Sequence, residues 1–535
     1  MRMTTRFAVV SSGMLALAFS AVTAAQTRPE AGRVLQETQP EITTPTRPSV
    51  DFQPAGAPLS DGKPGGKRVK IERLRFTGNT VFDGAILQQM LGGEALQRPL
   101  DLAGLRALAN RVSAYYRAQG YPFARAVLPA QKLTDGELLI RVVEGRYGEV
   151  HARSGDESLA EAAEGFLAPL QPGGLIESAA LMRTILVLGD QPGIEIEPVM
   201  RPGSETGTGD LAVDVRRGNR WEGSLGLDNH GNRFSGEYRL RADLAYHGLL
   251  TFGDRLSLQG LVSDERLWLG ALEYSRPLGH RGLRGKLSIS RTEYDLRSPY
   301  EGFTGTADVV EAGLSYPLMR SRGSNVTLEA DYVHKWLDNA FDDVNYEEKT
   351  SSSLPMGLRF DHRDPLGVTY GRLGVTPGRI ESNAAGVPDG DFTKGELRIG
   401  RMQVLPAGLS LRGLVRAQWA AEPLDSSETL ALGGAGGVRA YPQGEATGSR
   451  GWLSRFELHR AIGDIDPYVF YDIGRVLSFE QEDGRTLAGA GLGVAYRSAS
   501  WQTELTVAWR TRGGEPRSDD RTRDPRAWFG ATYRF

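Results

Sequence analysis

The 535-residue sequence has no cysteine, which excludes disulfide bonds, thiolate nucleophiles and cysteine-ligated zinc sites. Its seven histidines form no HxH or HxxxH pair, so a histidine-ligated metal site is not expected either. G-x-S-x-G, Walker and HExxH motifs are missing, and we expect neither catalysis nor a cofactor. Basic and acidic residues nearly balance, 63 against 66, which argues against nucleic acid as a partner.

Long apolar runs are also missing, because no stretch of 18 apolar residues follows the N-terminal segment. In residues 1–25, Arg2 and Arg6 accompany an apolar run from Phe7 to Phe19, and small residues follow at Ala21 to Ala25. This order predicts an export signal peptide that is cleaved near the end of the segment. The alternative is a membrane anchor, although the run is shorter than the about 20 apolar residues that a membrane-spanning helix needs.

Glycine is abundant, with 67 residues, and so are aromatic residues (8 Trp, 18 Tyr and 18 Phe), a mixture typical of chains with many strands and turns. Seven prolines mark residues 26–66 as an extended linker. Within it, Glu30 to Thr38 is free of proline and is a candidate short helix. Nine residues are marginal as an isolated helix, so it would need a docking site. The alternative is a disordered linker throughout.

Residues 67–218 contain one order of elements twice, which predicts two small α/β domains at 67–148 and 149–218. Each has the order β-α-α-β-β, with strands recognised by alternation and helices by apolar residues every three or four positions. In the first domain these elements are Val69 to Phe76, Val81 to Met90, Leu100 to Gln119, Ala124 to Pro129 and Leu138 to Glu144. In the second they are Glu149 to Ala152, Leu159 to Leu167, Leu175 to Leu188, Gly193 to Met200 and Asp210 to Arg216.

Residues 219–535 consist of about sixteen segments of alternating polarity that are separated by turn residues. In Glu237 to Tyr246 the apolar side chains share one face and the charged side chains share the other, and Trp501 to Arg510 has a similar pattern. After a signal peptide, this favours an outer-membrane β-barrel with lipid outside and a polar lumen. A soluble β-sandwich would also alternate, but its strands average about 5–6 residues, and several segments here are longer.

The sequence ends with RAWFGATYRF, in which Tyr533 and Phe535 share a face. A terminal phenylalanine after alternating aromatic residues resembles the signal by which outer-membrane proteins are recognised for assembly. The barrel assembly machinery and outer-membrane lipid are therefore expected partners. The simpler interpretation is a last barrel strand, which holds in either case.

Four short motifs, in this order and on this architecture, give the chain a family resemblance. They are GYPFARAVLPAQ at Gly120 to Gln131, GELLIRVVEG at Gly136 to Gly145, GVRAY at Gly437 to Tyr441 and FYDIG at Phe470 to Gly474. With them the chain resembles the two-partner secretion transporters (the TpsB family, ShlB/FhaC/HecB-like), within the superfamily that contains BamA. The resemblance covers essentially the whole mature chain.

The resemblance implies both a fold and a function. The fold is two periplasmic POTRA domains, at 67–148 and 149–218, followed by an antiparallel transmembrane β-barrel of sixteen strands at 219–535. The function is export of one large, unfolded partner (a TpsA-like adhesin, haemolysin or contact-dependent toxin) that the POTRA domains recognise. The resemblance also implies a helix that occupies the pore at rest, and Glu30 to Thr38 stands at that place in the sequence.

A candidate latch comes from the glycine-rich segment between Ala420 and Ser449, the longest loop expected in the barrel, which carries Arg439. On the strand Ile465 to Leu477, alternation directs Asp472 into the lumen. If the loop folds inward, Arg439 can meet Asp472, and a guanidinium–carboxylate pair is strong and geometrically definite. The alternative is a solvated loop arginine and an unrelated lumen aspartate.

The residues beside this pair match the family's lid-loop and barrel-wall motifs with one departure. The matching residues are Gly437, Val438, Tyr441, Phe470 and Gly474. Where the family usually has VRGY, this chain has Ala440 in place of the glycine. If that position requires a positive φ, alanine would be strained there and the loop tip would differ.

Other functions compete with export. An assembly factor that inserts other barrels, as BamA and TamA do, is the main alternative, but two POTRA units favour export because those relatives carry more. A passive porin would not need the periplasmic domains. An outer-membrane lipase or protease has the least support.

Overall fold

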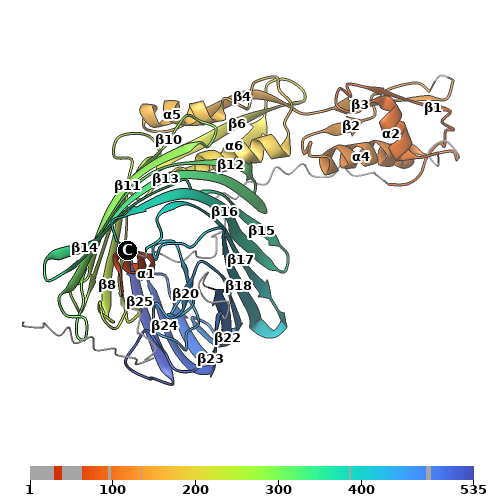
Figure 1. The fold of residues 1–535 in the computed structure, drawn as a ribbon. Coiled ribbons are helices and arrows are strands. Elements are labelled where there is room, and N and C mark those ends of the chain that lie inside the picture. Colours follow the sequence, from red (N-terminus) through yellow and green to blue (C-terminus); the bar gives the residue numbers. More distant parts are fainter. Residues whose placement is uncertain (1–28, 39–62, 94–97, 134, 385–386, 478–483) are drawn as a thin grey trace, which may run out of the picture.

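The structure is a computed structural model that describes residues 29–38, 63–93, 98–133, 135–384, 387–477 and 484–535. The predicted signal peptide and most of the proline-rich linker lie outside these residues. Figure 1 shows two small α/β domains joined to a barrel, with the short helix α1 (Ala31–Thr38) inside the ring of barrel strands. No helix in the described ranges is long and apolar enough to cross a lipid bilayer.

The first α/β domain has the predicted order of elements, β1 (Arg73–Thr77), α2 (Gly84–Leu91), α4 (Leu102–Ala118), β2 (Arg125–Val127) and β3 (Glu137–Val143). β3 lies in the centre of the sheet, parallel to β1 and antiparallel to β2. The carboxylates of Asp83 and Asp101 cap α2 and α4 by accepting N–H donors of the first turn. The first strand is shorter than predicted, because Val69 forms only an isolated bridge, with Leu100.

The second α/β domain repeats the arrangement with β4 (Arg146–Arg153), α5 (Glu157–Leu167), α6 (Ser178–Gly189), β5 (Ile194–Pro202) and β6 (Thr208–Arg217). β6 is central, parallel to β4 and antiparallel to β5. β4 begins at Arg146, three residues before the predicted start of this domain at 149. The reason is local: Gly145 turns the chain with a φ of +77°, and the strand pairs with β6 directly afterwards.

The barrel is closed and antiparallel. Its first segments are β7 (Trp221–Asp228), β8 (Arg239–His247), β9 (Arg255–Ser263), β10 (Trp268–Pro277), β11 (Arg284–Asp295), β12 (Phe303–Arg320), β13 (Ser324–Phe341), β14 (Val344–Ser353) and β15 (Met356–Asp364). The remaining segments are β16 (Gly367–Ser382), β17 (Gly390–Val404), β18 (Leu409–Ala420), β21 (Arg450–Arg460), β22 (Ile465–Leu477), β23 (Arg485–Arg497), β24 (Trp501–Arg512) and β25 (Arg526–Arg534). A short 3-10 turn, Pro406–Gly408, joins β17 to β18.

β14 and β15 are two halves of one barrel strand, because both pair with β13 on one side and with β16 on the other. Pro355 interrupts the strand, since proline has no N–H to donate to the ladder. The interruption is still tied to both neighbours, through Leu354 N–H to Pro377 C=O and Asp331 N–H to Pro355 C=O. Counted this way, the described residues form the sixteen-stranded barrel that was predicted.

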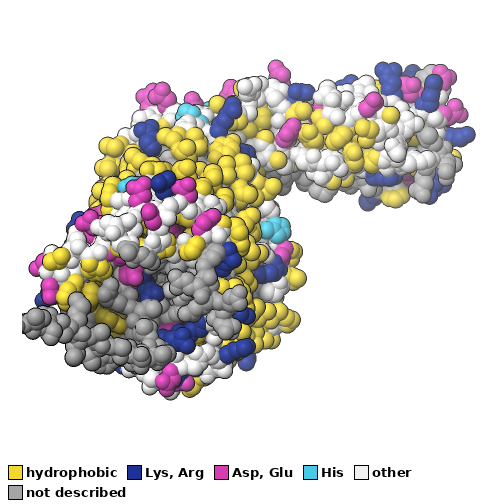
Figure 2. Space-filling model, viewed as in Figure 1, with side chains coloured by type: hydrophobic (Ala, Val, Ile, Leu, Met, Phe, Trp, Pro, Cys, Tyr) yellow, Lys and Arg dark blue, Asp and Glu magenta, His cyan; other side chains and the backbone are white. Residues whose placement is uncertain are grey.

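The barrel strands present apolar side chains outward and polar side chains inward. On β24, Trp501, Leu505 and Trp509 are 48%, 46% and 42% exposed, whereas Thr506 and Ala508 are buried on the inner side. Figure 2 shows hydrophobic side chains gathered over the outer face of the barrel. A surface of this kind is stable against lipid rather than water, which confirms the predicted alternation and the barrel class.

The second α/β domain is fastened to turns at one end of the barrel. Both oxygens of Asp190, just after α6, accept hydrogen bonds of 2.6 Å from Arg320 at the end of β12. Arg183 of α6 donates to the carbonyl oxygen of Pro317 at 2.6 Å. A bidentate pair fixes orientation as well as distance, so this domain has a defined position on the barrel.

Candidate functional site

The loop between β18 and β21, residues 421–449, folds into the barrel and is called the lid loop here. Two short strands at its base, β19 (Leu430–Ala431) and β20 (Thr447–Gly448), pair with each other. At the tip, Val438 N–H donates to the carbonyl oxygen of Leu432 at 2.7 Å. The tip residues that pack into the lumen are almost fully buried: Val438, Arg439, Ala440 and Tyr441.

Arg439 and Asp472 meet in a bidentate ion pair. Arg439 Nε donates to Asp472 Oδ2 at 2.8 Å, and Nη2 donates to Oδ1 at 2.7 Å. The backbone N–H of Arg439 also donates to Oδ2, at 3.1 Å. The arginine is 2% exposed and the aspartate 0%, so loss of either partner would leave the other charge buried, at a cost of about 3–5 kcal/mol. The structure thus brings together the two residues predicted to meet.

Arg439 has three further contacts that sequence reasoning missed. Its Nη1 donates to Glu457 Oε1 at 2.7 Å, and its guanidinium lies 3.5 Å from the ring centroid of Phe470. Trp528 Nε1 donates to the Arg439 carbonyl oxygen at 2.7 Å. Burial alone would lower the pKa of Arg439, but Asp472 and Glu457 raise it above its ordinary value, so the guanidinium stays charged. Of these contacts, the one with Glu457 could have been anticipated, because the alternation along its strand directs Glu457 into the lumen.

Ala440, the departure from the family motif, is not strained, because it is absent from the described non-glycine residues with positive φ. Its methyl group instead requires space on the wall. A Cβ added at Gly489 on β23 would lie 2.5 Å from the Ala440 Cβ. The condition under which alanine would be strained is therefore not met, and Gly489 is what makes room for the alanine.

The other motif residues also serve close packing of the tip. A Cβ at Gly437 would collide with the Leu432 carbonyl oxygen at 1.9 Å, and one at Gly474 would lie 2.8 Å from the Leu432 side chain. The Tyr441 hydroxyl lies 2.8 Å from the carbonyl oxygen of Arg512. These residues shape the tip and the wall against which it packs.

The C-terminal aromatic residues lie on the outer face, at the opposite end of the barrel from the lid loop. Tyr533 is 36% exposed and Phe535 is 60% exposed, and their rings stack with centroids 6.2 Å apart. Tyr533 also contacts Trp501 on the adjacent strand. This leaves a small aromatic cluster accessible at the end of the chain, next to the junction of β25 with β7.

Helix α1, which forms within the predicted Glu30 to Thr38 segment, docks on the inner wall. Val34 and Leu35 belong to an apolar cluster with wall residues such as Leu269 and Leu337. The N–H of Ala31 donates to Asn339 Oδ1 on β13 at 3.0 Å. The wall thus provides the docking site that a helix this short requires.

The lid loop forms the other side of the α1 docking site. Gln36 Nε2 donates to the Thr429 carbonyl oxygen at 2.8 Å, and Arg33 Nη2 donates to Thr447 Oγ1 at 3.1 Å. A Cβ at Gly32 would lie 2.7 Å from the backbone nitrogen of Ser427, so the helix backbone approaches the loop closely. The helix therefore lies between the wall and the base of the lid loop.

Glu37, near the end of α1, sits in an environment unfavourable to its charge. Burial raises its pKa from 4.5 to about 7, although Arg33 and Arg239 act to lower it. Its Oε1 is buried without a hydrogen-bond partner in the described structure. The docked helix therefore favours the protonated form of this carboxyl group.

Two lid-loop carboxylates are clamped by three lysines of the barrel wall, a cluster that the sequence did not reveal. Glu428 lies 2.5 Å from Lys335 Nζ and 3.0 Å from Lys394 Nζ, and Asp425 lies 2.8 Å from Lys349 Nζ. Burial alone would raise the pKa of Glu428, but the two lysines lower it to about 2. The base of the lid loop is thus ionically fixed, and we call these five residues the lysine clamp.

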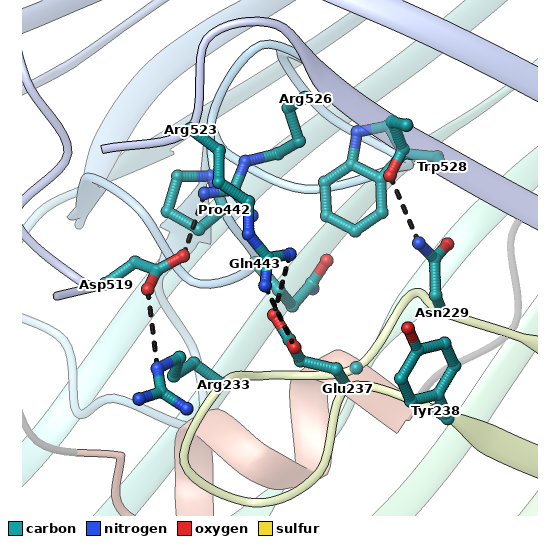
Figure 3. A pocket seen from close by; sticks show the side chains of 12 residues that line it. Asn229, Arg233, Glu237, Tyr238, Pro442, Gln443, Asp519, Arg523, Arg526 and Trp528 are labelled. Carbon is teal, nitrogen blue, oxygen red and sulfur yellow. Dashed lines mark hydrogen bonds and ion pairs between the residues drawn. The ribbon is translucent and has the colours of Figure 1, made fainter. Parts of the chain in front are cut away.

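The barrel closes where β25 meets β7, along a ladder of five residue pairs in the described structure. Above it, Figure 3 shows Asp519 between Arg233 and Arg526, and Glu237 beside Arg523. The cavity there is about 20 Å³, room for little more than one water molecule. Within the described ranges, no group of three or more metal-ligating side chains is suitably placed for a metal ion.

Comparisons with known proteins agree with this architecture. Residues 207–496 match the family model described as "Haemolysin secretion/activation protein ShlB/FhaC/HecB", and residues 69–145 match "POTRA domain, ShlB-type". The heme/hemopexin transporter protein HuxB of Haemophilus influenzae is 25% identical over 509 residues, which cover 89% of this chain and 88% of HuxB.

Solved structures show the same fold. CdiB from Escherichia coli superposes with a TM-score of 0.74 at 21% identity, covering 90% of this chain and 94% of CdiB. BamA from Haemophilus ducreyi, lacking POTRA domains 1–3, is a more distant neighbour, with a TM-score of 0.51 at 14% identity over 87% of this chain and all of that one. The arrangement is thus nearer to CdiB than to BamA.

Proposed function

The chain belongs to the haemolysin secretion/activation protein family ShlB/FhaC/HecB, and we propose that it exports a large partner protein across the outer membrane as a two-partner secretion transporter. The observation that carries this is a closed sixteen-stranded barrel, matched by that family model, whose lumen holds an inward-folded, ion-paired lid loop. HuxB is named a heme/hemopexin transporter. The family description, haemolysin secretion/activation protein, concerns a secreted protein, and the cargo we propose for this chain is a secreted, TpsA-like polypeptide. No catalytic step enters the proposal.

The POTRA domains act in this proposal as the periplasmic receptor. Each sheet has two outer strands, β1 and β2 in the first domain and β4 and β5 in the second. An unfolded client can add a strand to such an edge through backbone hydrogen bonds, which demand little of its sequence. The fixed attachment of the second domain through Asp190 and Arg320 would then deliver the client to the barrel mouth in a defined position.

Arg439 and Asp472 act as a latch that keeps the lid-loop tip against β22 of the wall. Two parallel hydrogen bonds between opposite charges define one geometry, and burial makes every alternative placement of either charge costly. Gly437, Val438, Ala440 and Tyr441 shape the tip, and Phe470 and Gly474 shape its seat. The latch therefore orders the loop that lines the export path.

Helix α1 acts as a plug that must leave before cargo can pass. It lies inside the ring of barrel strands and touches both the wall and the base of the lid loop. An eight-residue helix is not stable alone in water, so displacement would also unfold it. The plug is thus a reversible closure.

Biogenesis would depend on the chain's own C-terminal strand. Tyr533 and Phe535 are exposed to the lipid side at the closing strand, where the barrel assembly machinery could recognise them. Barrel assembly by this chain of other proteins, as BamA performs it, is the alternative function, and the more distant similarity to BamA gives it less support.

Export is tested by deleting the transporter in its own host and comparing the large proteins released into the medium with those of the parent strain. A large protein that disappears is the candidate cargo. Loss of that protein from the medium, restored by the full-length chain, supports the proposal. Normal export without the transporter would contradict it. If other outer-membrane barrels disappear from the membrane as well, the assembly-factor alternative is favoured instead.

A further inference from the structure

His459 on β21 lies next to Glu457, which contacts Arg439 of the latch, and sits between the carboxylates of Glu457 and Asp466. Its Nε2 is 2.9 Å from Glu457 Oε2 and its Nδ1 is 3.1 Å from Asp466 Oδ2. The ring is 2% exposed and stacks on Tyr468, with ring centroids 4.5 Å apart and planes 22° apart. Nε2 is hydrogen-bonded to Glu457, whereas Nδ1 approaches Asp466 without a hydrogen bond in the described structure.

Glu457 is the link between this histidine and the latch. Its Oε1 accepts from Arg439 Nη1 at 2.7 Å, while its Oε2 faces His459. A carboxylate held at both oxygens has one orientation, so the histidine determines where Glu457 meets the arginine. Register supports this, since Glu457 and His459 pair with Phe470 and Tyr468 on β22, the strand that carries Asp472.

Asp466, the second carboxylate beside His459, is held by two arginines at the periplasmic end of the barrel. Asp466 Oδ2 accepts from Arg412 on β18 at 3.0 Å and from Arg497 on β23 at 2.9 Å. The groups directly against the ring are Glu457 on the same strand and Asp466 and Tyr468 on β22. Charged groups also contact these three residues: Arg455 on β21, Arg412 on β18, Arg497 on β23 and Glu504 on β24.

We propose that His459 is a positioning residue for the export latch: packed on Tyr468 and beside Asp466, it holds Glu457 against Arg439. The proposal rests on the proposed role of Arg439 and Asp472. With the ring in place, Glu457 keeps the orientation in which it meets Arg439, and the tip is tightly seated. Without the ring, one oxygen of Glu457 loses this partner, and the tip is released more often.

The absence of cysteine from the chain provides a clean reporter of tip release. Val438 at the tip is 0% exposed, so Val438→Cys places a single thiol that a water-soluble maleimide reaches only when the tip leaves its seat. The full-length chain, purified in detergent, is labelled in this background alone and with Arg439→Ala, His459→Ala, His459→Gln or Glu457→Gln. The Arg439→Ala variant gives the rate for an unlatched tip.

We expect His459→Ala to raise the labelling rate about tenfold, the effect of losing one hydrogen bond to a charged group on an equilibrium. His459→Ala combined with Glu457→Gln should label no faster than Glu457→Gln alone, because the histidine acts through that carboxylate. An unchanged rate in His459→Ala, or independent effects in the combined variant, would overturn the relay. An unchanged rate in Arg439→Ala would instead overturn the latch itself.

Rescue by a conservative variant separates positioning from a merely structural role. His459→Gln keeps an amide that can donate to Glu457, so its labelling rate should lie between those of the Val438→Cys background and His459→Ala. A His459→Gln rate equal to that of His459→Ala would contradict the proposal. An unchanged rate in Glu457→Gln would contradict it even if His459→Ala fails to fold.

Discussion

The lid-loop tip and helix α1 both occupy the barrel lumen, but different chemistry holds them. The tip has a charged group, Arg439, whose donors meet Asp472 and Glu457 in a buried site. The helix is held by apolar packing of Val34 and Leu35 together with single hydrogen bonds to the wall and the lid loop, and it carries a carboxyl group, Glu37, whose pKa burial raises to about 7. Strong, fully paired charges suit an element that stays, whereas an unfavourable buried acid suits an element that leaves.

The largest effect is expected when the charge balance of the latch is broken. Asp472→Ala leaves the buried Arg439 guanidinium with Glu457 as its remaining carboxylate, and removal of one partner of a buried pair costs about 3–5 kcal/mol. We expect export to fall strongly and the thermal unfolding midpoint of the purified barrel to drop. Arg439→Ala is the matched variant. The Arg439→Ala variant should lose export but keep an assembled barrel, because the Asp472 carboxylate that remains still has Arg455 beside it. Full export by both variants would refute the latch.

The lysine clamp should matter nearly as much, because it holds the part of the lid loop that faces α1. Glu428→Ala leaves Lys335 and Lys394 buried without their shared carboxylate, which should destabilise the loop base by about 3 kcal/mol. In a planar lipid bilayer, this variant should show more frequent opening to ionic current. Glu422→Ala is the control in the same loop, since Glu422 is exposed. Equal currents from the two variants would show that the clamp does not restrain the plug.

Sequence reasoning succeeded where a pattern is local and failed where partners are distant. The alternation along β22 correctly placed Asp472 in the lumen, and Arg439 was identified through its motif. Lys335 and Glu428 are 93 residues apart and meet only because the lid loop folds inward. On their own strands, the lysines are indistinguishable from ordinary lumen charges.

The division of β14 from β15 shows a further limit of the same kind. Alternation continues on both sides of Pro355, so the periodic pattern alone does not reveal the interruption. The strand is retained because its neighbours on both sides bridge the gap. Likewise, the fit of Ala440 depends on Gly489, a glycine that alternation identifies only as one more small residue of a strand.

The raised pKa of Glu37 predicts that docking of helix α1, the proposed plug, depends on pH. Because the docked helix binds a proton more tightly than a free carboxyl group with a pKa of 4.5, docking is strongest below pH 4.5 and weakens as pH rises through about 7. With allowance for its partial exposure, the change amounts to about 2 kcal/mol. Bilayer currents of the full-length chain should therefore increase from pH 5 to pH 8.

Glu37→Gln removes this ionisation while keeping the size of the side chain, and its current should vary less with pH and stay low at pH 8. Maleimide labelling of the tip thiol in the Val438→Cys background should not respond to Glu37→Gln, because the tip is held by the contacts of Arg439 with Asp472 and Glu457 and not by this carboxyl group. Identical pH profiles of the current for the Glu37→Gln variant and the unaltered chain would mean that the plug is not governed by this carboxyl group. The contrast between plug and tip would then rest on packing alone.

The smallest effect concerns how closely the tip fits its seat. Gly489→Ala would bring two Cβ atoms to 2.5 Å, and overpacking of a well-packed site costs about 1–3 kcal/mol. Gly395→Ala on β17 is the matched control, because no atom lies within 4 Å of the added Cβ there. We expect a lower unfolding midpoint for Gly489→Ala alone. Adding Ala440→Gly should recover most of the loss. Recovery will be incomplete, because the new Cβ also lies 3.1 Å from the Trp509 carbonyl oxygen. If Ala440→Gly brings no recovery, the tip does not rest on β23, and the rigid seat inferred for the lid loop must be looser than the docking site of α1.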